Sequence, residues 1–260
     1  MLGHAAAPAL ADAPTPAAGS APAAAPTVAV LALQGAFIEH EKKLAKLGCR
    51  TIELRQRADL QQHFDALVLP GGESTVQAKL LRELDMFDDL QARIAQGLPV
   101  LGTCAGLILL AEHVHSASDG RTLATSPSDT SADPNHSATP VNGFRTFPIT
   151  VVRNGYGRQL GSFVAKAKLA AHTPPLPSSA AADSLTAPAK EIPLVFIRAP
   201  RITATSPEVQ TLVALDSEPM AVRFKNQFGC TFHPELTDDD SIYRMFLNHL
   251  HMTCVREPKN

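Results

Sequence analysis

A chain of 260 residues is long enough to bury a hydrophobic core without disulfide or metal staples, which excludes the stapled mini-protein class. The formal net charge of -2 at pH 7 provides no positive field for polyanions, so we expect no nucleic acid and no membrane surface as a partner. The four cysteines are widely spaced without a C-x-x-C pair, and no run of about 18 apolar residues could span a bilayer, so we expect a soluble cytoplasmic protein with free thiols.

Three stretches of the chain lack the hydrophobic periodicity of a folded core. Residues 1–26 are rich in alanine and proline and lack the arginines of a transit peptide. Residues 115–140 and 172–190 are rich in Ser, Ala and Pro, and they are longer than ordinary connections within a compact domain. We therefore predict a disordered tail at 1–26, one domain at 27–254 with disordered insertions at about 115–140 and 172–190, and a C-terminal tail at 255–260.

The first half of the core alternates between strand and helix patterns. The apolar run at 28–33 predicts a buried strand, and the periodic segment at 36–47, which ends at Gly48, predicts a helix. Further strands are expected at 50–54, 66–69 and 99–102, and further helices at 75–84, 87–96 and 105–112. Short apolar strands that alternate with helices are typical of a parallel sheet covered on both faces.

The second half contains mostly strands and one closing helix. The expected strands are 147–153, 194–197, 211–215, 221–224 and 229–232, and the helix is 240–252. The sheet is therefore expected to become mixed in this half. Together the elements predict an α/β fold, a single three-layer domain with a mostly parallel central sheet flanked by helices.

Cys104 lies where a buried strand turns into a helix. Gly102 and Gly106 flank it and permit the tight strand-to-helix turn of a nucleophile elbow. The N-terminus of the following helix offers backbone N–H groups and a positive dipole end, which favour a thiolate and can hold an oxyanion. Taken alone, G-x-C-x-G is equally compatible with a buried, unreactive cysteine.

His233 and Glu235 follow the last predicted strand in an H-P-E sequence. In an extended segment, residues i and i+2 point to the same side, so the carboxylate can orient the imidazole. His233 could then take the proton of Cys104, which would give a Cys-His-Glu triad. The alternative is an ordinary surface turn before a helix.

Other polar groups follow strand ends. Gly71, Gly72, Glu73 and Ser74 come directly after the third strand and open a helix, where α/β sheets place ligands. The segment matches neither a dinucleotide fingerprint nor a P-loop, so it indicates an oxyanion hole or a small polar substrate, or alternatively a helix cap.

Arginines at two strand ends are candidates for binding a carboxylate. Arg153 ends one apolar strand and Arg198 follows another, although lone arginines in such places are often only solvated. No histidine pattern has the spacing of a metal site, so we predict no metal and no other cofactor.

The motifs together resemble one family. They occur in the order L-A-L-Q-G-A (31–36), L-P-G-G-E-S-T (69–75), G-T-C-A-G-L (102–107), R-N-x-x-G-R-Q (153–159), F-I-R-A-P (196–200) and G-C-x-F-H-P-E-L (229–236). This set resembles the glutaminase subunit of pyridoxal 5′-phosphate synthase, within the triad (class I) glutamine amidotransferases and their flavodoxin-like fold. The elbow and H-P-E alone would indicate only the broad class. The G-G-E-S-T, R-N-x-x-G-R-Q and I-R-A-P blocks narrow the resemblance from this broad class to the one family.

The resemblance implies a role for each matching residue. It implies Cys104 as the nucleophile and His233 and Glu235 as its partners. It implies an oxyanion hole at Gly72 and Ala105, and a glutamine site formed by Gly72, Glu73, Ser74, Arg153, Ile197 and Arg198. Gly155 and Tyr156 depart from the family pattern, but neither departure removes a reactive group.

The resemblance also implies a partner and a reaction. Glutamine would be hydrolysed to glutamate through a γ-glutamyl thioester, and the ammonia would pass to a separate (β/α)₈-barrel synthase subunit. We hypothesise that this partner repositions the peptide near Gly71 and Gly72, since a Gly-Gly pair permits such a change.

Three other hypotheses for the function stay open. The chain could be a glutaminase that serves another acceptor pathway, such as imidazole-glycerol-phosphate synthesis. It could be a noncatalytic docking subunit whose insertions block the cleft. A cysteine peptidase would share a Cys, a His and a carboxylate, and a substrate screen would separate it.

Overall fold

A computed structural model describes residues 25–116, 141–156, 161–170 and 190–256. Almost all of the predicted N-terminal tail, most of both predicted insertions and the last four residues lie outside these ranges. His115 and Ser116, which were assigned to the first insertion, instead belong to a strand. Within the described parts, no helix combines the length and the apolar composition needed to cross a bilayer.

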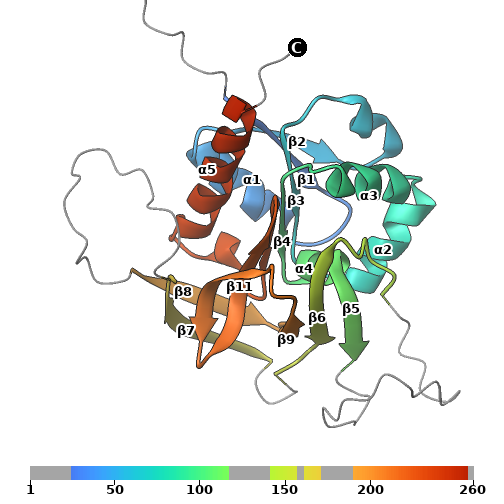
Figure 1. The fold of residues 1–260 in the computed structure, drawn as a ribbon. Coiled ribbons are helices and arrows are strands. Elements are labelled where there is room, and N and C mark those ends of the chain that lie inside the picture. Colours follow the sequence, from blue (N-terminus) through green and yellow to red (C-terminus); the bar gives the residue numbers. More distant parts are fainter. Residues whose placement is uncertain (1–24, 117–140, 157–160, 171–189, 257–260) are drawn as a thin grey trace, which may run out of the picture.

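A seven-stranded sheet forms the centre of the fold (Figure 1), in the order β10-β11-β12-β4-β3-β1-β2. Its strands are β1 (Thr27–Leu31), β2 (Arg50–Leu54), β3 (Ala66–Leu69), β4 (Val100–Thr103), β10 (Gln210–Leu215), β11 (Glu218–Phe224) and β12 (Gln227–Cys230). β2, β1, β3, β4 and β12 pair in parallel, and β11 and β10 continue the sheet antiparallel. The predicted α/β fold with a mostly parallel central sheet is confirmed.

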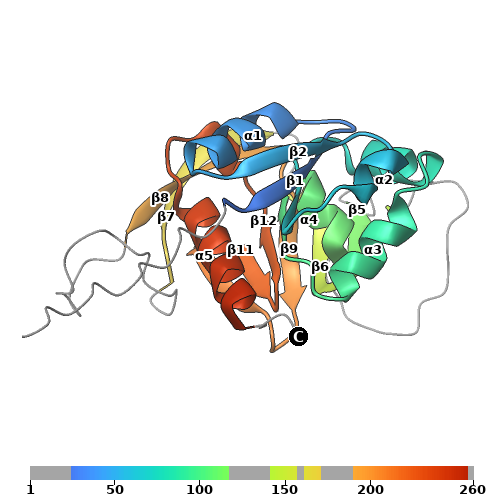
Figure 2. The ribbon, with the colours of Figure 1, turned by 90° about the horizontal axis from the view of Figure 1, so that it is seen from above.

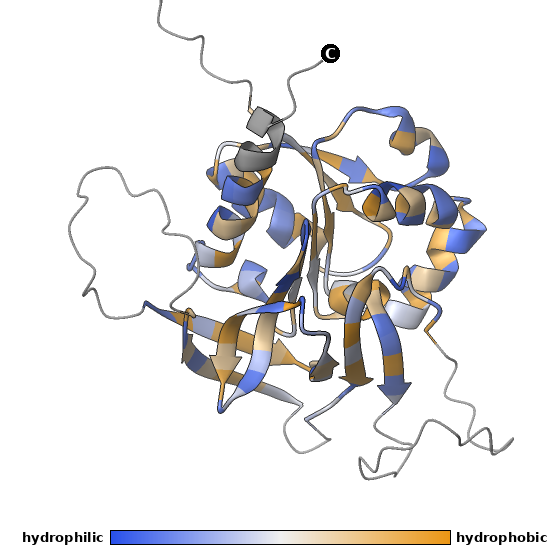
Figure 3. Ribbon diagram, in the orientation of Figure 1, coloured by the Kyte–Doolittle hydropathy of each residue, from blue (hydrophilic) through white to orange (hydrophobic). Residues whose placement is uncertain are grey.

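Helices cover both faces of this sheet and complete three layers (Figures 1 and 2). The helices are α1 (Phe37–Lys46), α2 (Ser74–Glu83), α3 (Phe87–Ala95), α4 (Ala105–Leu110) and α5 (Ser241–Arg256), with short 3-10 turns η1 (Arg57–Gln61) and η3 (Pro234–Leu236). α1 and α5 pack on one face, in a cluster with Val28, Val30 and Val68. α2, α3 and α4 pack on the other, in a cluster with Ala29 and Leu67. Alternate residues of β1 and β3 therefore contact opposite helical layers, which explains why these central strands are almost entirely apolar, whereas the sheet as a whole contains both hydrophobic and hydrophilic positions (Figure 3).

Two smaller sheets lie beside the central one. The first has the order β5-β6-β9, and the second pairs β7 with β8. Their bounds are β5 (Ala111–Ser116), β6 (Phe147–Arg153), β7 (Ser162–Lys168), β8 (Glu191–Ile197) and β9 (Arg201–Thr205).

The predictions were least accurate in these smaller sheets. The helix predicted for 105–112 ends at Leu110, and the chain continues directly into β5, which pairs in parallel with β6. β7 and β9 were not predicted. β7 buries one side chain, that of Ala167, and leaves lysines between small residues, so its sequence carries little apolar alternation.

The carboxyl ends of β3, β4 and β12 lie at one edge of the central sheet, because these three strands are parallel neighbours. The segments that follow them contain Gly71 to Ser74, Cys104 and His233. The fold therefore brings together three motifs that are far apart in the sequence.

Candidate active site

Cys104 occupies a strained turn between β4 and α4. Its φ of 48° and ψ of -100° lie outside the regions that ordinary residues prefer. The turn is held because the Cys104 N–H donates to the Cys230 carbonyl at 2.8 Å, and the thiol lies 3.9 Å from the Ile197 carbonyl oxygen. The side chain is thereby fixed at the start of a helix, as the nucleophile-elbow prediction requires.

His233 and Glu235 form a buried pair next to this turn. The Nδ1 atom of His233 lies 2.6 Å from Oε1 of Glu235, and both residues are at least 94% buried. An ionised carboxylate accepts a hydrogen bond but cannot donate one, so Nδ1 carries the proton and Nε2 is left for the reaction. Within the described residues, Nε2 has no hydrogen-bond partner.

The electrostatics of this pair favour a charged imidazole. Burial lowers the pKa of His233, but its interactions with Cys104 and Glu235 outweigh burial and raise the pKa to about 10. Burial raises the pKa of Glu235, but His40 and His233 lower it by more than burial raises it. The net pKa therefore lies below its usual value. An imidazolium between a thiol and a carboxylate is the arrangement that stabilises a thiolate.

The loop after β3 approaches the imidazole closely. A Cβ atom on Gly71 would lie 2.4 Å from Cε1 of His233, so this position requires glycine. The Gly71 carbonyl accepts a hydrogen bond from Ala36 N at 3.1 Å, and the Glu73 N–H donates to Oε1 of Gln34 at 2.8 Å. The segment after β1, which contains Gln34 and Ala36, therefore holds this loop in place.

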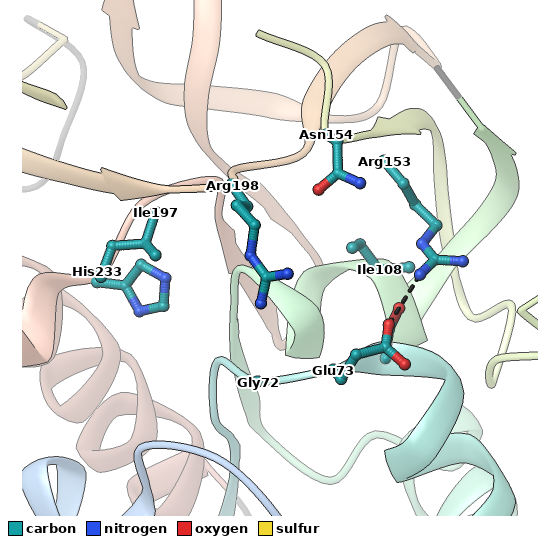
Figure 4. Close-up of a pocket in the computed structure, with 9 residues that line it drawn as sticks. Gly72, Glu73, Ile108, Arg153, Asn154, Ile197, Arg198 and His233 are labelled. Atoms are coloured by element: carbon teal, nitrogen blue, oxygen red, sulfur yellow. Dashed lines mark hydrogen bonds and ion pairs between the residues drawn. The ribbon is translucent and has the colours of Figure 1, made fainter. Parts of the chain in front are cut away.

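A cavity of about 150 Å³ opens beside this loop. It is lined by Gly72, Glu73, Ser74, Ile108, Arg153, Asn154, Ile197, Arg198 and His233. Figure 4 shows Arg153 reaching Glu73 and the guanidinium of Arg198 lying between His233 and Glu73. The contact from Arg153 Nη2 to Glu73 Oε1 is 2.7 Å. The cavity therefore presents both cationic groups and one anionic group beside the imidazole.

Glu73 is ionised in this arrangement. Burial raises the pKa of Glu73. Hydrogen bonds from Thr75 and Val76 and the charge of Arg153 lower it by more than burial raises it, so the net pKa lies below its usual value. Glu73 also caps α2, since its side chain accepts from Val76 N. The helix-cap alternative and the binding alternative are therefore both compatible with this residue.

The structure brings all the predicted site residues to this edge of the sheet. Seven of them line the cavity, Cys104 and Glu235 contact the lining residues Ile197 and His233, and Ala105 follows Cys104 at the start of α4. Ile108 and Asn154 also line the cavity and were not predicted as site residues. Ile108 could have been inferred from its place one turn after Cys104. Asn154 has a φ of 52°, and only its position beside Arg153 gave a signal.

His40 on α1 is buried, contacts this site and was also not predicted. Its Nε2 atom lies 3.5 Å from Oε2 of Glu235.

Among the residues that the structure describes, no group of three or more His, Cys, Asp or Glu side chains has the arrangement of a metal site.

Comparison with known proteins identifies the family. The profile of the SNO glutamine amidotransferase family matches residues 30–125 and 135–252. The chain belongs to this family. A pyridoxal 5′-phosphate synthase subunit PdxT of Desulfitobacterium hafniense (strain DSM 10664 / DCB-2) is 44% identical over 223 residues, which cover 86% of this chain and 92% of the relative. A PdxT subunit of Methanocorpusculum labreanum is 42% identical over 220 residues, covering 85% and 95%.

Solved structures agree with this family assignment. A crystal structure of a glutamine amidotransferase is 32% identical, with a TM-score of 0.66, and the match covers 86% of this chain and 98% of that one. PurLQS from Thermotoga maritima is 12% identical with a TM-score of 0.53, over 88% of this chain and 99% of that one. This second likeness concerns the fold alone.

Proposed function

We propose that this SNO-family glutamine amidotransferase is the glutaminase subunit of a pyridoxal 5′-phosphate synthase, and that Cys104, His233 and Glu235 are its catalytic triad. The observation that carries the assignment of residues is the buried His233–Glu235 contact of 2.6 Å beside a cysteine in a strand-to-helix elbow. The assignment of the pathway rests on the PdxT relatives that match over most of their length.

The first half of the reaction forms a thioester. The Cys104 thiolate attacks the carboxamide carbon of glutamine, and the carbonyl electrons move to oxygen. We assign the oxyanion hole to the amides of Gly72 and Ala105, the second of which begins α4. The C–N bond then breaks as the His233 imidazolium donates its Nε2 proton to the departing nitrogen, which releases ammonia.

The second half releases glutamate. Neutral His233 accepts a proton from water through Nε2, the hydroxide attacks the thioester carbon, and the C–S bond breaks to regenerate the thiolate. Glu235 keeps the proton on Nδ1 throughout, so the imidazole always presents Nε2 to the reacting atoms. No metal or organic cofactor enters either half.

The cavity supplies matching groups for the substrate's amino-acid end. We assign its α-carboxylate to the guanidinium of Arg153 or Arg198, which can bind it with two parallel hydrogen bonds. Glu73 offers the opposite charge for the α-ammonium group. Gly72, Ser74 and Ile197 complete the walls along the substrate's side chain.

The ammonia is proposed to pass to the synthase subunit, a (β/α)₈ barrel. Free hydrolysis of glutamine would waste nitrogen, so we expect the isolated chain to be a weak glutaminase and the complex a faster one. Repositioning of the Gly71–Gly72 peptide on binding is the proposed cause.

Measurement of glutamate release from glutamine, with and without the synthase subunit, tests the proposal. We expect wild-type activity to rise with the synthase, and Cys104→Ala to lose it by about 10⁴-fold or more. Cys49→Ala removes a different buried thiol and is the matched control. If wild type released no glutamate even with the synthase, the chain would be a noncatalytic docking subunit. If glutamine hydrolysis required a different acceptor subunit, the pathway assignment would be wrong.

A further inference from the structure

His40 lies behind the triad in a fully buried position on α1. Its two ring nitrogens contact residues from three other segments. Nδ1 lies 2.7 Å from the hydroxyl of Tyr243 on α5, and Nε2 lies 3.1 Å from Oγ1 of Thr103, the residue before the nucleophile. Nε2 also faces Oε2 of Glu235 at 3.5 Å.

His40 faces the far oxygen of Glu235. Oε1 is used by His233, whereas Oε2 is buried and has no hydrogen-bond partner among the described residues. A buried carboxylate oxygen without a donor is costly, and an unrestrained carboxylate could rotate away from His233. Within the described part of the chain, the side-chain nitrogen that faces Oε2 is Nε2 of His40.

The contact with Glu235 favours a proton on Nε2 of His40. Burial lowers the pKa of His40, so the ring is neutral and has a single N–H. A lone pair on Nε2 facing a carboxylate oxygen would be repulsive, which places the proton on Nε2. Nδ1 is then an acceptor, and the Tyr243 hydroxyl donates to it.

We propose that His40 is a positioning residue whose Nε2–H, hydrogen-bonded to Thr103, lies close enough to Oε2 of Glu235 to hold the carboxylate against His233 by electrostatic attraction, with Tyr243 fixing the required tautomer. This proposal rests on the proposed glutaminase function. It adds two residues, on α1 and α5, to the machinery of the triad. The same Nε2–H contacts Thr103, so the carboxylate and the nucleophile turn are aligned through one ring.

The groups that face His40 bear on any pH dependence. They are Glu235 and His233 after β12, Tyr243 on α5 and Glu39 on α1 itself. Cys230 and Asp240 act on Tyr243 from β12 and from the start of α5. The Cys230 thiol is fully buried and burial raises its pKa, so it stays neutral while the triad titrates.

The matched variants are His40→Gln and His40→Met. Gln and Met have similar size and shape, but only Gln keeps an N–H donor and an oxygen acceptor for Tyr243. In the complex with the synthase, we expect His40→Met to lower kcat about tenfold, the loss typical when a residue that orients a reactive group is removed, with KM for glutamine within about twofold. His40→Gln should stay within about threefold of wild type.

Alkylation by iodoacetamide, measured against pH, provides a readout that a merely structural role would not move. The Cys104→Ala change in each background subtracts alkylation of the other thiols. For His40→Met, the midpoint of the alkylation profile should rise by about one pH unit. At any pH below the midpoint, this shift means about tenfold less reactive thiolate. His40→Gln should keep the wild-type midpoint. Tyr243→Phe, which leaves His40 in place, should give a smaller upward shift.

Equal profiles for the Met and Gln variants, or an unchanged profile in Tyr243→Phe, would overturn the proposal. Tyr243→Phe decides the question if both His40 variants fail to fold. The failure of the proposed function is distinguishable, because in that case wild type itself would release no glutamate.

Discussion

The wall of the cleft that carries Cys104, His233 and Glu235 comes from the central sheet, whereas the wall that carries Arg153 and Arg198 comes from the two smaller sheets. The first wall is buried and held by several hydrogen bonds. In the second wall, Arg198 is exposed and has a φ of 44°, and Ile197 is 40% exposed.

This difference matches two tasks. Chemistry requires groups held to a fraction of an ångström, and packed strand ends provide that. Binding of a small zwitterion requires charges that can adjust as it enters, and strand ends at the rim provide those. We therefore expect changes in the first wall to lower kcat and changes in the second to raise KM.

The largest effect is expected for Glu235→Gln. The amide keeps the size of the side chain but removes the charge that stabilises the His233 imidazolium and fixes its tautomer. We expect kcat to fall by about 10³- to 10⁴-fold with KM nearly unchanged. Steady-state kinetics of glutamate release in the complex measure both. A rise in KM without loss of kcat would show that the two walls are not divided in this way.

A smaller effect is expected for Arg153→Lys in the second wall. Lysine keeps the charge but loses the paired N–H groups that fit a carboxylate. KM for glutamine should rise by roughly tenfold, which is about 1.4 kcal/mol, while kcat stays within about threefold. Arg50→Lys, on the edge strand β2 with an exposed side chain, is the control and should change neither constant.

Gly35→Ala tests how tightly the loop after β3 is held. Gly35 has a φ of 108°, and an added Cβ would lie 1.8 Å from the Gly71 carbonyl oxygen. We expect a loss of about 2–3 kcal/mol of stability, from backbone strain and displacement of that carbonyl, together with loss of activity.

Gly48→Ala is the matched control for this change. Gly48 also has a positive φ, of 84°, but no atom lies within 4 Å of the added Cβ. It should lose about 1 kcal/mol and keep its activity. Chemical denaturation measures the stability of the two variants, and glutamate release measures their activity. Equal activities would contradict the proposed role of the loop.

The smallest effect concerns stability alone. Asp240 pairs with Lys43 at 2.9 Å, and this contact, together with Lys46, outweighs burial and lowers the pKa of Asp240 below 3.8. A carboxylate with a lowered pKa in the folded state stabilises above its unfolded pKa, and the effect is lost as pH falls. Asp240→Asn should therefore cost about 1 kcal/mol at pH 7, and the difference from wild type should shrink below pH 4. A difference independent of pH would contradict the pairing.

The first wall could be predicted from the sequence because its signals are local. Cys104 lies between two glycines at a strand end, and His233 and Glu235 are two residues apart. The second wall was only partly predictable. Arg153 lies at the end of β6 and Arg198 follows β8, and neither strand's own sequence shows which strand it pairs with. β7 pairs with β8 across a long connection, and its lysine-rich sequence gives no strand period.

His40 shows the limit of sequence reasoning more clearly. It lies 195 positions before Glu235 and 203 before Tyr243, so only the packing of α1 and α5 on one face of the sheet brings the three together. In the sequence it is one of ten histidines, on a helix of ordinary amphipathic pattern.

The proposed mechanism depends most directly on Cys104 as the nucleophile of a glutamine-specific site. A diazoketone analogue of glutamine alkylates a nucleophile that recognises the substrate and loses N₂ in doing so. Incubation of the complex with this analogue, followed by mass spectrometry of the digested chain, locates the adduct. We predict a single adduct on Cys104, prevented by excess glutamine and absent in Glu235→Gln at short times. An adduct on Cys49 or Cys230, or labelling that glutamine does not prevent, would contradict it.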